Sequence, residues 1–167
     1  MMDHQQSARH GRTDTRSYVM LAINFLLGLI VMYVAMFTMI DGWQDFHNNI
    51  NMLYMALTMA APMGIIMLAT MGRMYTRRGL NTALYLGFAA LSVASFAATR
   101  TQALVEDRQF IASMIPHHSG AILMCRQNHF TDQELARLCD DIIRSQRNEI
   151  EQMNRIRSRL EAGMVPQ

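Results

Sequence analysis

The stretch YVMLAINFLLGLIVMYVAMFTMI, residues Tyr18–Ile40, decides the fold class because it is 23 residues long and contains no charge. A helix needs about 20 apolar residues to cross the hydrocarbon core of a membrane. Two further uncharged runs follow, over residues 50–72 and 80–99. We therefore predict three transmembrane helices. From residue 100 onward charged residues recur every few positions, which predicts a region in contact with water.

The distribution of arginine predicts how the three helices cross the membrane. Arginines precede the first run and fill the gap between the second and third, whereas residues 41–49 contain two aspartates and no Arg or Lys. Short loops rich in basic residues stay cytoplasmic. We expect a cytoplasmic tail over residues 1–17, three transmembrane helices over 18–99, a helical hairpin outside the cytoplasm over 100–161, and a tail over 162–167. A net charge of +2 does not favour a nucleic-acid partner.

Two amphipathic helices are predicted after residue 100, so the fold class is all-α. Gln127–Asp132 has the composition of a turn, and Thr131 or Asp132 suits the start of a second helix of about 29 residues. A short connection makes the two helices antiparallel neighbours, as in a fragment of a four-helix bundle. With the turn centred near residue 130, facing residues should have numbers that sum to about 260, such as His118 and Ile142.

The stretch MIPHHSGAILMC, residues 114–125, lies on the first of these helices and combines methionine, histidine and cysteine. Met114 and His118 are four residues apart and share a face, and His117 lies beside them. Pro116 has no N–H and crowds the carbonyl four residues back. We expect it to kink or restart the helix just before the two histidines.

The hairpin sequence resembles the bacterial family called domain of unknown function 305 in two segments, DRQFIASMIPHHSGAILM (107–124) and IIRSQRNEIEQM (142–153). The resemblance covers about residues 107–153 and leaves out the membrane portion. It implies a ferritin-like helical module outside the bacterial cytoplasmic membrane, and some relatives are associated with copper binding or tolerance. Carried over by position, the residues that match the two motifs are Met114, His117, His118, Met124, Gln146, Glu149 and Met153.

The chemistry of these side chains predicts a site for a soft metal ion, most favourably copper. Thioether and imidazole ligands favour Cu(I). We expect Glu149 and Gln146 to orient an imidazole, and the direct ligands to be drawn from Met114, His117, His118, Met124 and Met153. A di-iron site is not expected, because the Glu-x-x-His pairs that it requires are absent. In the alternative interpretation the histidines satisfy a kinked helix and the methionines fill the seam between the helices.

The two cysteines, Cys125 and Cys139, lie 14 residues apart across the predicted turn. In an oxidising compartment they would form a disulfide that clamps the hairpin, provided that their Cα atoms lie within about 7 Å. The alternative is that their thiolates bind metal. The sequence leaves both open.

Three functions follow from these patterns. The first is a membrane protein that binds copper for sequestration or tolerance without catalysis, because no nucleophile and base are arranged for hydrolytic chemistry. The second is a structural protein whose hairpin pairs with a second copy. The third is a copper transporter that uses the methionine stripe of the second run, formed by Met52, Met55, Met59, Met63, Met67, Met71 and Met74. Expected partners are membrane lipid, a soft metal ion and a second copy of the chain.

Overall fold

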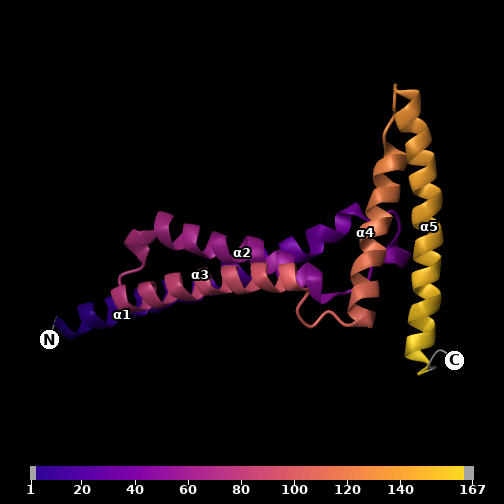
Figure 1. The fold of residues 1–167 in the computed structure, drawn as a ribbon. Coiled ribbons are helices and arrows are strands. Elements are labelled where there is room, and N and C mark those ends of the chain that lie inside the picture. The colour runs from indigo at the N-terminus through magenta and orange to yellow at the C-terminus, as the bar shows by residue number, and fades with distance from the viewer. Residues whose placement is uncertain (1–2, 164–167) are drawn as a thin grey trace. The chain divides into compact units, whose positions relative to one another are not determined.

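The computed structural model describes residues 3–163, with side chains described from residue 15 onward. Residues 1–2 and 164–167, the outer ends of the two predicted tails, lie outside the described residues. The described part is all-helical (Figure 1). Its elements in chain order are α1 (Asp3–Ala35), the 3₁₀ turns η1 (Met36–Met39) and η2 (Trp43–Asp45), α2 (Ile50–Thr70), the 3₁₀ turn η3 (Gly72–Met74), α3 (Arg78–Thr101), α4 (Asp107–Gln127) and α5 (Gln133–Glu161).

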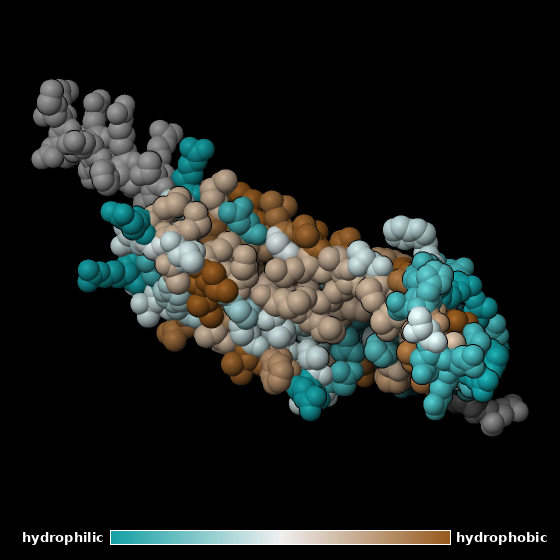
Figure 2. Space-filling view, turned by 90° about the horizontal axis from the view of Figure 1, so that it is seen from above, coloured by the Kyte–Doolittle hydropathy of each residue, from teal (hydrophilic) through white to brown (hydrophobic). Residues whose placement is uncertain are grey.

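Three of the helices are long and apolar enough to cross a membrane, which confirms the predicted fold class. These segments are Thr15–Met39, Ile50–Thr70 and Arg78–Thr101. Their exposed surfaces are largely apolar, whereas hydrophilic residues gather on the hairpin (Figure 2). The first helix begins at Asp3, so the described part of the expected N-terminal tail continues the first span as helix.

The chain divides into two compact units that are discontinuous in sequence. The first contains the residues up to Val34 together with Leu53–Thr101, and the second contains Ala35–Met52 together with the residues from Gln102 onward. The predicted domain boundaries place residues 35–52 with the membrane helices. In the structure this segment belongs to the same unit as the hairpin.

The first unit packs through small and aromatic side chains. The buried residues of α2 are mostly small, and a Cβ atom at Gly64 would lie 2.7 Å from the ring of Phe88. Glycine is needed there because the aromatic ring occupies the space of a side chain. The methionines of α2 lie elsewhere: Met55, Met59 and Met63 are 45–48% exposed. The predicted stripe thus includes surface residues of this unit, and its use for transport stays a prediction.

The second unit is built around the antiparallel pair α4 and α5, which lie side by side (Figure 1). Asp132 accepts a hydrogen bond from the backbone N–H of Leu135 at 2.8 Å, which confirms one of the two predicted helix caps. The core between the helices contains four buried isoleucines. Partly buried residues of α5 pack against them. The members of this isoleucine core are Ile111, Ile115, Ile122, Ile150, Ile143, Met153, Ile156 and Leu160.

The register of the hairpin differs by about one turn from the predicted one. His118 lies beside Glu149, not beside Ile142, so the facing numbers sum to 267. At the tip the sum is 264, because Cys125 is joined to Cys139. The prediction assumes only that the turn is centred near residue 130. In the structure the register is consistent with the disulfide and with packing of the isoleucine core.

Candidate functional site

The segment that joins the first two apolar helices is held against α4 by a buried polar pair. Ser119 is fully buried, and its hydroxyl donates a hydrogen bond to Asp45 Oδ2 at 2.6 Å. The same hydroxyl oxygen accepts the backbone N–H of Asp41 at 2.7 Å. Asp45 is only 6% exposed, so its carboxylate needs such a donor. The serine of the HHSG sequence therefore serves the packing of residues 36–49.

Pro116 contributes to the same packing. The prediction that it restarts the helix is wrong, and the prediction that it kinks the helix stays a prediction. The α-helix runs from Asp107 to Gln127 without interruption. The missing N–H of Pro116 frees the carbonyl of Ala112 four residues back. Asn49 fills this vacancy by donating its side-chain amide to the Ala112 oxygen at 3.2 Å. The helix continues because a partner from outside it satisfies the free carbonyl.

Two further contacts complete the attachment of residues 36–49. A Cβ atom at Gly120 would lie 3.2 Å from the backbone oxygen of Met39, so the absence of a side chain allows the close approach. Arg126 Nη1 lies 2.6 Å from Asp41 Oδ2 and forms an ion pair with it. Much of the motif around the histidines is thus explained by packing. The two histidines remain to be explained.

His118 points from α4 toward α5 and is 8% exposed. Its Nδ1 atom lies 3.1 Å from Glu149 Oε2, at ion-pair distance but without the alignment of a hydrogen bond. Glu149 is itself oriented, because its Oε1 accepts the hydroxyl of Ser145 at 2.8 Å. Burial lowers the pKa of His118, the carboxylate of Glu149 opposes this effect, and His117 adds to it. The neutral form that results is the form that binds metals.

His117 lies on a different face of α4 and is exposed. The centres of its ring and of the His118 ring are 6.1 Å apart. Two imidazoles that share one ion, each with its nitrogen about 2 Å from the metal, have ring centres at most about 6.3 Å apart. The separation is therefore at the upper end of what a shared ion allows. Met114, half-buried, precedes His117 by one turn of the same helix.

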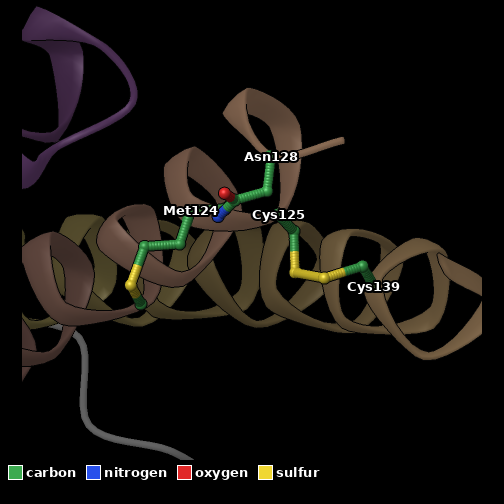
Figure 3. Close-up of a disulfide and its surroundings, with 4 residues drawn as sticks. All are labelled: Met124, Cys125, Asn128 and Cys139. Carbon is green, nitrogen blue, oxygen red and sulfur yellow. A yellow bond between two sulfur atoms is a disulfide. The ribbon is translucent and has the colours of Figure 1, made fainter. Parts of the chain in front are cut away.

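The other predicted site residues are more widely placed. Met153 packs against the isoleucine core, and Gln146 is half-buried on α5. Met124 is 50% exposed, and Figure 3 shows its side chain directed away from the nearby disulfide. Ten residues separate Met114 from Met124, which is roughly 15 Å along a helix. The structure thus brings His118 near both Glu149 and His117, and leaves Met124 apart from Met114.

The two cysteines are joined in a disulfide, with Cα atoms 5.3 Å apart (Figure 3). Bonded sulfurs are not thiolates, so the alternative in which they bind metal does not apply to this state. Among the described residues, no three His, Cys, Asp or Glu side chains lie close enough together to hold a metal ion. A site at the histidines therefore needs thioether ligands or ligands from another chain.

Sequence reasoning missed the residues that attach the segment to α4, chiefly Asp45, Asn49 and Ser119. One signal was present: a serine among the mainly apolar residues on the packed faces of a helix needs a polar partner. The aspartates of residues 41–49, taken from the sequence alone, indicate only the orientation of the membrane helices. Their pairing with a helix 74 positions further along has no local pattern.

Comparison with known proteins places the chain among its relatives. Residues 89–157 match the family described as "Domain of unknown function (DUF305)". An uncharacterized protein of Acanthamoeba polyphaga mimivirus is 36% identical over 114 residues, which cover 67% of this chain and 73% of the viral protein. The chain belongs to the DUF305 family. No solved structure matches this DUF305 protein.

The family resemblance reaches further toward the N-terminus than the two motifs suggested. The DUF305 match begins at residue 89, inside α3. From residue 100 onward the chain has only 68 residues, so the 114 residues aligned with the viral protein must include part of the apolar region. The statement that the membrane portion lies outside the resemblance is therefore wrong for at least the end of α3.

Proposed function

We propose that this DUF305 protein is a multi-pass membrane protein whose hairpin binds a soft metal ion, most favourably copper, for sequestration or tolerance. The observation that supports this proposal is the approach of Glu149 to His118. Metal-binding histidines usually direct one ring nitrogen at a carboxylate, which fixes the tautomer and leaves the other nitrogen for the ion. His118 has this arrangement, with Nδ1 beside Glu149 and Nε2 as the remaining ligand atom.

The neighbouring donors suit the same kind of ion. His117 is exposed, and Met114 lies one turn before it. Imidazole together with thioether favours Cu(I) over hard cations, which prefer oxygen ligands. Glu149 and Gln146 would then act on the imidazoles, while Met153 fills the core.

The disulfide supports a location of the hairpin outside the reducing cytoplasm. Disulfides persist in oxidising compartments and are rare in the cytosol. The arginines beside the first span and between the second and third support the same orientation. For a bacterial host this is the outer side of the cytoplasmic membrane.

Binding, not catalysis, is the activity proposed. Ser119 is the hydroxyl nearest to the histidines in sequence, and it is fully buried and bonded to Asp45. It is out of reach of a substrate. The exposed part of the motif consists of ligand-type side chains.

The test is a copper titration of the full chain, purified anaerobically in detergent. We expect bound Cu(I) in the native protein and its loss in the variant His117→Ala/His118→Ala. His129→Ala is the matched control, because His129 is exposed in the turn between α4 and α5. Native protein that gains no copper, or a double variant that keeps full stoichiometry, would remove the proposal.

A further inference from the structure

Helix α4 has three faces, and contacts within the second unit occupy two of them. One face packs on α5 through isoleucines of the core, including Ile111 and Ile115. Another holds residues 36–49 through Ser119. The third, which we call the open face, contains Phe110, His117 and Met124, with half-buried Met114 and Ala121 between them. Ser113 lies at its edge, where its hydroxyl accepts the side-chain amide of Asn51 at 3.2 Å.

The open face is apolar and uncharged, which is unusual for an exposed helix face in water. Phe110 and Met124 are each 50% exposed. Residues 110–124 contain no Asp, Glu, Lys or Arg. An amphipathic helix normally presents charged residues to solvent, and contiguous exposed apolar surface marks a site of interaction.

The spacing of the large residues on this face is symmetric about His117. Phe110 precedes it by seven residues and Met124 follows it by seven, and positions seven apart lie nearly in line along a helix. A two-fold axis through the middle residue would therefore bring Phe110 of one copy against Met124 of the second copy. Thioether–aromatic contacts of this kind are favourable.

We infer that a second copy of this chain packs its α4 antiparallel on the open face, with His117 of both copies at the two-fold axis, so that two copies share one soft ion. The inference rests on the proposed function, and it adds the partner and the missing ligands. In such an isologous contact, residues whose numbers sum to about 234 face each other. Met114 then lies near Ala121 of the second copy, whose small side chain leaves room for it.

The shared ion would explain how a site forms where one chain is poor in ligands. Among the described residues no three His, Cys, Asp or Glu side chains of one chain can hold an ion. Two copies supply two His117 imidazoles around the axis, and the Met114 thioethers and the His118 Nε2 atoms are the candidates for the remaining positions. Each copy contributes only three large apolar side chains to the contact, whereas a stable interface involves roughly 20 to 30 residues a side. The pairing should therefore depend on the ion.

Light scattering of the full chain in detergent, with copper analysis on the same fractions, tests the shared site. With Cu(I) we expect the mass of two chains and one copper per two chains, and with His117→Ala the mass of one chain. His129→Ala should behave as the native protein. Copper bound at one ion per chain with the mass of a single chain would overturn the shared site and leave the proposed function standing. Absence of bound copper would remove both.

Cross-linking tests the placement of the axis. Both native cysteines are bonded to each other, so Ala121→Cys introduces the one reactive thiol. Position 121 is four residues from the axis, which puts the two thiols roughly 12 Å apart in the paired state, within reach of a bismaleimide spacer. The control is Ser158→Cys, an exposed position on α5. Linked dimers at 121 and not at 158 support the inference, and equal or absent linking at 121 contradicts it.

Discussion

Ser119 and Asp45 lie 74 positions apart in sequence and form a buried hydrogen bond of 2.6 Å between α4 and the segment that joins α1 to α2. The bond also fixes the role of the residues around it. Ser119 and Gly120 hold the segment, so the histidines that precede them are presented by a helix that is anchored on two sides.

Replacing Ser119 by alanine should destabilise the second unit by about 1–3 kcal/mol, because the buried carboxylate of Asp45 loses its donor and the N–H of Asp41 loses its acceptor. Thermal unfolding and hydrogen exchange over residues 36–49 measure the effect. Ser158→Ala is the control, since the hydroxyl of Ser158 is exposed and bonds only within its own helix. Equal decreases in stability in the two variants would show that the buried hydrogen bond stabilises the unit no more than an exposed one.

Changing Cys125 and Cys139 together to serine should lower the free energy of unfolding of the hairpin by about 3 kcal/mol. The disulfide closes a loop of 14 residues, and the open chain regains the conformational freedom of that loop. Chemical denaturation measures the change. The native protein under reducing conditions should match the double variant, and an unaltered midpoint in both would contradict the expectation.

Stability should decrease as the pH is lowered below about 6.5, the ordinary pKa of histidine. Burial lowers the pKa of His118 in the folded state, so the unfolded chain binds the proton more readily and acid favours unfolding. The stability that neutral His118 contributes is fully present above its pKa in the unfolded chain, and it is lost as the pH falls toward its lower pKa in the folded protein. The free energy of unfolding of the native protein and of His118→Gln, measured in the presence of a chelator between pH 7.5 and 5, isolates the contribution of His118. A steeper pH dependence in the variant would reverse the assigned sign.

Glu149→Gln should weaken copper binding about 10- to 100-fold without removing a direct ligand. The amide keeps the shape of the side chain but no longer favours the tautomer of His118 that leaves Nε2 free. Competition with a Cu(I) chelator measures the affinity. Glu151→Gln, also on α5 but exposed, is the control. Unchanged affinity in Glu149→Gln would mean that the carboxylate does not orient a ligand.

Gly64→Ala should destabilise the first unit by about 1–3 kcal/mol, because the new methyl group would lie 2.7 Å from the ring of Phe88. Gly87→Ala is the matched control, since a Cβ atom at that helical position meets nothing within 4 Å. Unfolding in detergent compares the two variants. Tolerance of both would show that α2 and α3 can separate to accommodate the methyl group.

The sequence allowed the helices to be predicted well because their signals are local. The lengths of the uncharged runs predict the three apolar helices. The side chain of Asp132 predicts the start of α5, where it accepts the backbone N–H of Leu135. Helical periodicity also indicated a hairpin with α4 and α5 side by side. These features depend on residues within one or two turns of each other.

The features that were missed depend on contacts between distant parts of the chain. No periodicity connects Asn49 to the carbonyl freed by Pro116, or Asp45 to Ser119, because each pair joins segments more than 60 residues apart. The sequence identifies the residue types of the candidate site, but it predicts only part of their arrangement in space. Glu149 lies beside His118, but Met124 is separated from Met114 by three turns of helix.

The attachment of residues 36–49 to α4 has a consequence for how the protein is made. Asp45 leaves the ribosome long before Ser119 has been synthesised, so the acidic segment cannot form this bond until the nascent chain has delivered α4. A fragment that starts after Thr101 would contain the hairpin but leave the Ala112 carbonyl and Ser119 without their partners. The second unit is therefore not separable by one cut, and biogenesis of its fold is completed only after the third apolar helix has been translated.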